Sequence, residues 1–345
     1  MVDLQGQDLH GRFTAWLSEQ VGARATVDAL AVPGHGGYSN ETYVTAADWG
    51  DGRRGIVLRL APTGRTLFPD TDLDRQARIL EVLAAHTDIP VPRVLWTEDD
   101  VAVLGRPFYV MERVEGRIPP DRPGYHFEGW LKDASPNEQS LVLERGLDMM
   151  ARIARVDWQR AGLEFLDRPG HGEGALDQEL GYWRAYLDWA SDGERFDTLE
   201  RIWDWCVAYR PPDPARRELL WGDARLGNLV YGDDLSVRAV LDWEGAMLGP
   251  AELDLGWFLF LERLMHGFAR PPLPGFTDVD TMATTYEAAL GRPLEHLDWY
   301  ETWGGFRTAC IQVPLVTIAF EHGEAPDLRG RDENPLTAIL LQRIG

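Results

Sequence analysis

The residues best suited to chemistry lie between positions 219 and 249, in the segment LLWGDARLGNLVYGDDLSVRAVLDWEGAMLG. Asp223 and Asn228 are separated by four residues, and Asp242 follows two short apolar runs joined by a Gly-Asp-Asp turn. If the two runs form a hairpin, the turn brings Asp242 back beside the 223–228 loop. Two carboxylates and one amide would then converge, which is typical of phosphoryl transfer.

In that chemistry one Asp orients the acceptor hydroxyl and takes its proton, while an Asn and a second Asp hold Mg²⁺ on the nucleotide phosphates. We therefore interpret Asp223 as the base and Asn228 and Asp242 as Mg²⁺ ligands. Arg225 follows the base by two residues and can reach the γ-phosphate, where it would offset charge in the transition state. The alternative for the same residues is a surface hairpin with turn-forming Asp and Asn.

The elements that must position these residues follow from periodicity. Residues 9–21 and 72–86 have helical spacing, and β-type runs between 27 and 113 predict a five-stranded antiparallel sheet. Beyond residue 137 the pattern is mostly helical, interrupted by a β-like piece at 219–243. The fold class expected is therefore α+β, with a small sheet-containing lobe over 1–113 and a mainly helical lobe over 114–345. The expected helices of the second lobe are 138–156, 176–190, 195–209, 251–267, 278–290 and 296–321.

Composition limits the partners. The 34 basic and 56 acidic residues give a net charge of −22, which repels nucleic acid, so no nucleic-acid partner is expected. No apolar stretch approaches the roughly 18 residues of a membrane span, and no secretory signal is visible, so we expect a cytoplasmic protein without a membrane partner. Two cysteines and eight histidines without metal-binding spacing predict no zinc site. The oligomeric state is not predicted.

The run from Trp221 to Asn228, followed by Asp242-Trp-Glu244, resembles the HGDxxxxN and Dx[DE] signature of the aminoglycoside phosphotransferase family. The likeness is greatest to the subgroup that includes the kinase-like domain fused to some acyl-CoA dehydrogenases. Further similar segments are GGYSN at 36–40, VLRLAP at 57–62, PVPRV at 90–94 and GRPFYVME at 105–112. The resemblance covers roughly residues 30–260. It implies a two-lobed protein-kinase-like fold with ATP between the lobes.

The resemblance also implies further site residues. Glu244 joins Asp242 at the metal, and Asp254 anchors the catalytic loop from a helix N-terminus. The family's nucleotide-binding positions fall on a glycine hairpin, a strand, a helix and a hinge: Gly36, Gly37, Ser39, Asn40, Arg59, Gln76, Met111, Glu112 and Arg113. The glycine hairpin fails the GxGxxG template because Ser39 occupies the last glycine position, so a Rossmann fold is disfavoured.

Three departures from the family pattern matter. Trp221 replaces the usual histidine, and its indole can donate but not accept a hydrogen bond. Arg59 replaces the phosphate-binding lysine, since the only lysine is Lys132 in the other lobe. Gln76 replaces the glutamate that would pair with that cation, so we expect it to bond Arg59 without neutralising it. These changes motivate the alternative of a catalytically weak or inactive kinase-like nucleotide-binding protein.

The acceptor is expected to be the hydroxyl group of a small molecule. Ten tryptophans and tyrosines at 182–209 and 299–303 could line an apolar acceptor cleft, although an aromatic stripe at helical spacing more often belongs to a core. Net acidity and resemblance to the aminoglycoside kinases favour a cationic or neutral acceptor. Resemblance to the fused subgroup points instead to hydroxylated acyl compounds, and we do not expect a resistance enzyme.

Overall fold

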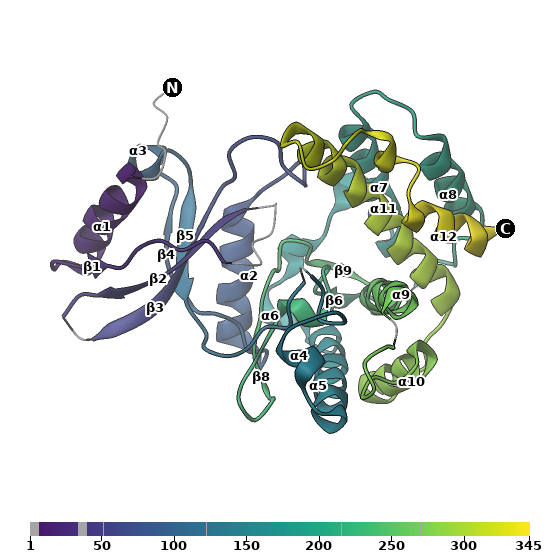
Figure 1. The fold of residues 1–345 in the computed structure, drawn as a ribbon, viewed down its shortest axis with the longest axis horizontal. Coiled ribbons are helices and arrows are strands. Elements are labelled where there is room, and N and C mark those ends of the chain that lie inside the picture. Colours follow the sequence, from purple (N-terminus) through teal and green to yellow (C-terminus); the bar gives the residue numbers. More distant parts are fainter. Residues whose placement is uncertain (1–6, 34–39, 51, 122, 215, 270) are drawn as a thin grey trace.

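The computed structural model describes residues 7–33, 40–50, 52–121, 123–214, 216–269 and 271–345. A five-stranded antiparallel sheet with helices on both faces occupies the N-terminal part, and a mainly helical part follows it (Figure 1). The predicted α+β class and kinase-like two-part architecture are therefore confirmed.

The sheet has the strand order β1-β2-β3-β5-β4, as predicted for five strands. Its strands and helices are α1 (Gln7–Val21), β1 (Thr26–Val27), β2 (Glu41–Asp48), β3 (Arg53–Leu60), α2 (Leu73–His86), β4 (Val94–Glu98), α3 (Val101–Leu104) and β5 (Phe108–Glu112).

Alternation along the strands buries both faces of the sheet, because successive side chains of a strand point to opposite sides. On β3, Ile56, Leu58 and Leu60 pack with α1 in one core cluster. Val57 and, on β5, Tyr109 belong to a second cluster that includes α2. Arg59 lies two residues after Val57 on β3, so its side chain points to the same face of the sheet as Val57. This face is the one covered by α2 and the helical part.

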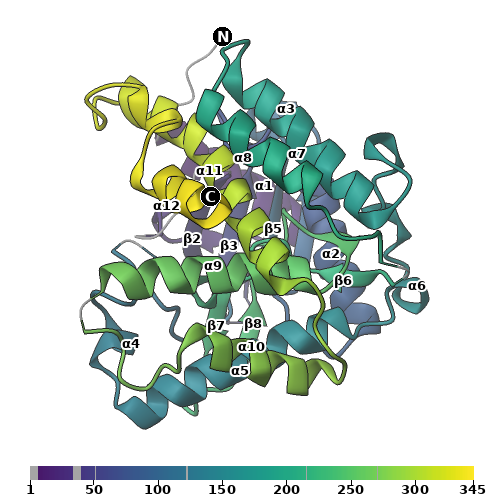
Figure 2. The ribbon, with the colours of Figure 1, turned by 90° about the vertical axis from the view of Figure 1, so that its right-hand side faces the viewer.

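The helical part carries the predicted helices within a few residues of their expected ends. It contains α4 (Trp130–Asp133), α5 (Pro136–Ala154), α6 (Trp158–Ala161), α7 (Ala175–Ser191), α8 (Asp197–Ala208), α9 (Glu252–Phe268), α10 (Val279–Leu290), α11 (Leu297–Glu321) and α12 (Pro335–Ile344). Helix α9 packs against α11, and α10 packs against α5 (Figure 2). The short helices α4 and α6 and the terminal helix α12 were not predicted.

The segment rich in candidate residues folds into short strands. Strand β6 (Glu218–Leu220) pairs with β9 (Met247–Gly249), and β7 (Leu229–Tyr231) pairs with β8 (Val237–Val240). The β7–β8 pairing is the predicted hairpin. It is antiparallel, so the residues after β8 return to the start of β7.

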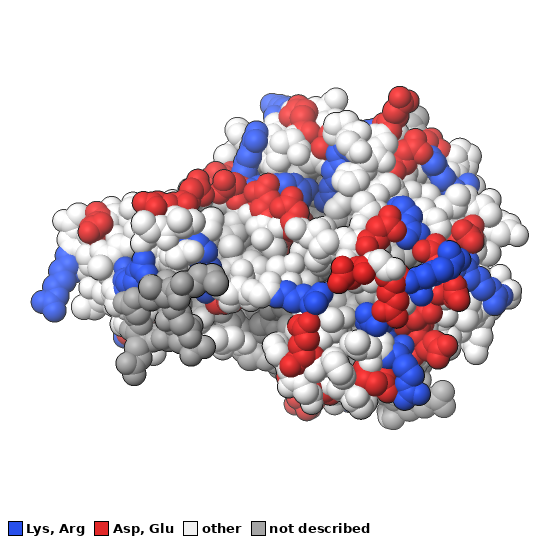
Figure 3. All heavy atoms as spheres, turned by 90° about the horizontal axis from the view of Figure 1, so that it is seen from above, with Lys and Arg blue, Asp and Glu red and all other residues white. Residues whose placement is uncertain are grey.

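The face of the molecule in Figure 3 carries acidic and basic side chains interspersed over its helical part. Within the described residues, no helix is both long enough and apolar enough to cross a membrane.

Candidate active site

A cavity of about 510 Å³ lies between the sheet and the helical part. Its walls come from β2, β3, β5 and α2 on one side, and from the 113–121 and 225–243 segments on the other. The structure brings nine of the predicted site residues to this lining: Asn40, Arg59, Gln76, Met111, Glu112, Arg113, Arg225, Asn228 and Asp242.

The Asp223 carboxylate is fixed by its own loop. Asn228, at the end of a 3₁₀ turn (Leu226–Asn228), donates from Nδ2 to Asp223 Oδ2 over 2.8 Å. Arg225 Nε donates to the same oxygen over 2.9 Å. Both bonds go to Oδ2, and Asn228 takes part through its amide nitrogen. The loop therefore leaves Asp223 Oδ1 and the Asn228 amide oxygen for other partners.

Arg225 lies among carboxylates. Besides its bond to Asp223, it donates from Nη1 to Asp121 Oδ2 over 2.8 Å. Burial lowers the pKa of Arg225, but the neighbouring charges of Asp223, Asp121 and Asp242 raise it by more, so the guanidinium stays charged. Sequence reasoning missed Asp121, whose only local signal is its position after two prolines.

The β7–β8 hairpin places Asp242 beside the loop of residues 221–228, here called the catalytic loop. The Leu241 N–H donates to the Asn228 carbonyl over 2.9 Å, and Asp242 follows with a left-handed φ of 61°. Arg59 reaches Asp242 Oδ1 from β3 with both terminal nitrogens, at 3.3 and 3.2 Å. This ion pair joins the sheet to the helical part.

The expected contact between Gln76 and Arg59 is wrong. Gln76 Oε1 instead accepts from Asn40 Nδ2 over 3.4 Å, and Asn40 Nδ2 also donates to Glu244 Oε2 over 3.1 Å. Glu244 Oε2 lies 3.8 Å from Arg59 Nη2. Asp242 and Glu244, which follow the hairpin, therefore neutralise the charge of Arg59. In the family pattern a helix glutamate has this function.

The hinge residues Met111, Glu112 and Arg113 line the cavity at the end of β5. Two of their backbone donors are already engaged: the Glu112 N–H donates to Arg93 O at 2.9 Å and the Arg113 N–H to Gly55 O at 3.0 Å. A backbone N–H that meets an adenine ring would therefore come from neither Glu112 nor Arg113. The predicted positions Gly36, Gly37 and Ser39 lie outside the described residues.

The replacement of histidine by Trp221 is compensated in the structure. The buried indole donates from Nε1 to the Leu241 carbonyl over 2.7 Å, which ties the start of the catalytic loop to the residue before Asp242. A donor alone is sufficient for this bond, so the inability of tryptophan to accept costs the loop nothing here.

Asp254 anchors the same loop from the first turn of α9. Its carboxylate accepts from the Trp221 N–H at 2.6 Å and from the Gly222 N–H at 2.9 Å. Arg307 of α11 donates to the Gly222 carbonyl over 2.8 Å. Burial raises the pKa of Asp254 to about 6, although the two backbone N–H groups and Arg307 oppose the shift.

We expect Asp254→Ala to lower the free energy of unfolding by several kcal/mol. The substitution orphans two buried backbone donors, each at a cost of about 1–3 kcal/mol. Because the raised pKa means that the folded state holds the Asp254 proton more tightly than the unfolded chain, the stability that this residue contributes falls as pH rises from about 4 to about 6. Urea unfolding at several pH values measures both effects.

The matched control is Asp298→Ala, because Asp298 is also in the first turn of a helix but its side chain is fully exposed. This variant should unfold like the wild type at every pH. Equal stabilities of the two alanine variants would contradict the anchoring role of Asp254.

Most of the ten aromatic residues predicted from the sequence pack between helices. Trp183, Tyr186, Trp299, Tyr300 and Trp303 are buried in a core cluster of α7, α8, α9, α11 and α12. None of the ten predicted aromatic residues lines the described cavity. This agrees with the favoured interpretation of the aromatic stripe as a core rather than with the alternative of an acceptor cleft, because packing between the helices takes up the aromatic surface.

Comparison with known proteins places this geometry in context. The model of the phosphotransferase enzyme family matches residues 31–293. The chain is 29% identical over 297 residues to the probable acyl-CoA dehydrogenase IBR3 of Arabidopsis thaliana, covering 81% of this chain and 35% of the plant protein. It is 30% identical over 322 residues to the acyl-CoA dehydrogenase family member 10 of Mus musculus, covering 89% and 28%. The chain thus spans about a third of the length of these relatives.

Solved structures share the fold. A provisionally named aminoglycoside phosphotransferase of Ralstonia eutropha matches with a TM-score of 0.69 and 23% identity, over 97% of each chain. A thermostable mutant of aminoglycoside phosphotransferase APH(4)-Ia, in a ternary complex with ADP and hygromycin B, matches with a TM-score of 0.56 and 18% identity, over 96% of this chain and 98% of the other.

Proposed function

Because the chain belongs to the phosphotransferase enzyme family, we propose that it transfers the γ-phosphoryl group of Mg·ATP to a hydroxyl group of a small molecule. The observation that carries the proposal is the convergence of three side chains: Asn228 and Asp242 line the cavity, and Asp223 lies directly behind them, bonded to Asn228. The ADP complex of the APH(4)-Ia structure supports a nucleotide in such a cavity. We place the boundary between a nucleotide-binding lobe and an acceptor-binding lobe after residue 113, and the protein in the cytoplasm.

Asp223 is the base in this proposal. Its Oδ1 takes the proton of the acceptor hydroxyl while Oδ2 stays bonded to Asn228 and Arg225. The hydroxyl oxygen then forms a bond to the γ-phosphorus, and the bond from that phosphorus to the β,γ-bridging oxygen breaks, which releases ADP. Arg225 keeps the Asp223 carboxylate oriented and places positive charge beside the transferring group.

The residues around Asp242 fit a magnesium ion. Asn228, Asp242 and Glu244 offer oxygen atoms, which Mg²⁺ prefers, and the buried Asn40 Oδ1 has no hydrogen-bond partner among the described residues. An Mg²⁺ ion held by these residues would supply positive charge that offsets the charge of the nucleotide phosphates. On the opposite wall, Arg59 meets the phosphates from β3, Gln76 holds Asn40 in place, and the segment after β5 borders the adenine.

The alternative is a catalytically weak or inactive nucleotide-binding protein, motivated by Trp221, Arg59 and Gln76. The structure weakens this alternative, because the Trp221 indole makes the anchoring bond and Asp242 and Glu244 supply the negative charge that Gln76 lacks.

Transfer of label from γ-labelled ATP to a pool of small alcohols tests the proposal. We expect a phosphorylated product that requires Mg²⁺. The names of the curated relatives support including hydroxylated acyl compounds, and the hygromycin B complex supports including aminoglycosides. Mg-dependent ATP binding in isothermal titration without transfer to any acceptor would favour the inactive alternative. Absence of nucleotide binding would overturn both.

A further inference from the structure

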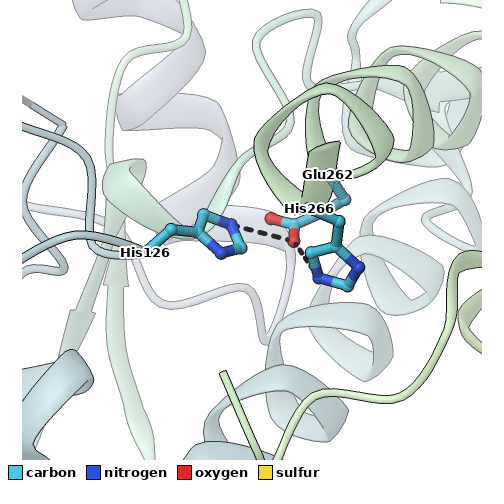
Figure 4. Close-up of side chains that lie close together, drawn as sticks. All are labelled: His126, Glu262 and His266. Carbon is cyan, nitrogen blue, oxygen red and sulfur yellow. Dashed lines mark ion pairs between the residues drawn. The ribbon is translucent and has the colours of Figure 1, made fainter. Parts of the chain in front are cut away.

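A second cluster of chemically capable side chains lies outside the phosphotransfer residues. His126 belongs to the 117–129 segment that follows β5, whereas Glu262 and His266 lie one turn apart on α9. One nitrogen of each histidine and one oxygen of Glu262 all lie within 4.8 Å of one another. Figure 4 shows both imidazole rings turned toward the same carboxylate.

The spacing of these atoms suits a small tetrahedral ion. His126 Nε2 is 3.2 Å from Glu262 Oε2, and His266 Nε2 is 3.6 Å from that same oxygen. Ligand atoms placed about 2.0–2.1 Å from a tetrahedral Zn²⁺ are about 3.3–3.4 Å apart. The two measured separations bracket that value, and the separation between the two histidine nitrogens is within 4.8 Å, so the three atoms could close around one ion by side-chain shifts.

The same atoms lack hydrogen-bond partners. Among the described residues, His126 Nδ1 and Nε2, His266 Nε2 and Glu262 Oε2 are buried and make no bond of acceptable geometry. His126 and Glu262 are only 1% and 2% exposed. Burying polar atoms without hydrogen bonds is costly, and the contacts of the two histidines with Glu262 Oε2 are ion pairs only if the rings are protonated. A cation that accepts lone pairs from all three atoms would satisfy them with both rings neutral.

The residues around His126, Glu262 and His266 hold these three side chains in place. The Tyr125 hydroxyl donates to Glu262 Oε1, which leaves Oε2 as the oxygen directed at the histidines. The ring of Phe276 packs against Tyr125, His126 and His266 and forms an apolar wall. Hydrogen bonds to a ligating carboxylate and an apolar shell are the outer features that hold metal ligands in place.

We propose that His126, Glu262 and His266 bind a divalent transition-metal ion, with Zn²⁺ as the preferred occupant. Two imidazole nitrogens and one carboxylate oxygen form a donor set that suits Zn²⁺ and disfavours Mg²⁺. The ion would join the 117–129 segment to α9, and Asp121 in that segment bonds Arg225. The site is separate from the oxygen ligands Asn228, Asp242 and Glu244, and it does not depend on phosphotransfer.

This proposal departs from the prediction of no zinc site, which the metal titration below tests. The sequence contains no pair of histidines at metal-binding spacing, because one ligand comes from a loop and the other two from a helix far along the chain. Only the fold brings them together.

Metal titration of the full, tag-free chain tests the site after a chelator has removed bound ions. Excess Mg²⁺ is kept present to occupy oxygen-ligand sites. We expect one Zn²⁺ per chain by competition with a chromophoric chelator, and Co²⁺ should give the strong visible absorption of a four-coordinate complex. Zn²⁺ should also raise the Tm of the wild type, because it binds the folded state.

Glu262→Gln and His266→Gln should each weaken Zn²⁺ binding by at least about 100-fold, since losing even an outer-shell partner costs about 10- to 100-fold. His266 is the less buried ligand, with 18% of its side chain exposed, so its replacement should preserve the fold. Far-UV circular dichroism of the metal-free variants checks this. The exposed His322→Gln is the matched control and should bind like the wild type.

Three results would overturn the proposal. They are a folded wild-type chain that binds no stoichiometric Zn²⁺, unchanged affinity in both ligand variants, and weak Co²⁺ absorption typical of six oxygen ligands. Loss of Zn²⁺ binding in Asp242→Asn but not in His266→Gln would likewise place the ion at the other site and reject this one.

Discussion

Replacing Asp223 with asparagine is expected to reduce the rate of phosphoryl transfer by about 10²- to 10⁴-fold, the range that a positioned general base contributes. The side chain keeps its shape, and its amide oxygen can still accept from Arg225 and Asn228. It can no longer take the acceptor proton. Nucleotide affinity should change little, because no predicted nucleotide contact involves Asp223.

Single-turnover transfer and isothermal titration of Mg·ATP separate the two effects. Asp233→Asn is the matched control, because Asp233 is an exposed carboxylate in the β7–β8 turn of the same segment. This control should retain the wild-type rate. A wild-type rate in Asp223→Asn, with any acceptor found, would assign the base to another residue.

Asp242→Asn is expected to abolish most of the Mg²⁺ dependence of nucleotide binding, weakening the affinity by at least about 10- to 100-fold, as measured for residues that only support metal ligands. Asparagine is the informative replacement. Residue 242 has a φ of 61°, a left-handed conformation that Asp and Asn tolerate and that alanine does not favour. The substitution therefore removes charge without adding backbone strain.

Titrations of ATP with Mg²⁺ and with a chelator measure this effect. Asp192→Asn is the matched control, because Asp192 has a φ of 50° and lies exposed at the end of α7. This control makes the same replacement at another left-handed position, and nucleotide binding should stay intact. Equal Mg²⁺ dependence in Asp242→Asn and the wild type would remove Asp242 from the metal ligands.

The sequence predicted the fold well where local pattern and tertiary structure agree. The β-type runs between 27 and 113 predicted a five-stranded antiparallel sheet, and the structure has five strands in that sheet. The turn between the two apolar runs around 232–236 predicted the hairpin that returns Asp242 to the catalytic loop. These features depend on residues close in sequence, where periodicity and turn chemistry are informative.

What the sequence did not predict depends on contacts across the chain. The family pattern predicted a partner for Arg59 on a helix, whereas its partners in the structure, Asp242 and Glu244, follow the hairpin. The bond between Asp121 and Arg225 joins a loop to a turn, and no periodicity connects them. The aromatic residues of α7 and α11 have helical spacing in either a cleft or a core, and only the packing distinguishes the two.

The bond between Arg307 and the Gly222 carbonyl has a consequence for where the catalytic unit ends. The family match stops at residue 293, yet Arg307 lies beyond it on α11 and stacks its guanidinium over the rings of Trp183 and Trp257. A fragment cut at residue 293 would keep every residue of the phosphotransfer signature. It would nevertheless expose the apolar surface of α9 and free the carbonyl that precedes Asp223. We therefore expect the smallest fragment that keeps this loop anchored to include α11, and homology alone would set the cloning boundary too early.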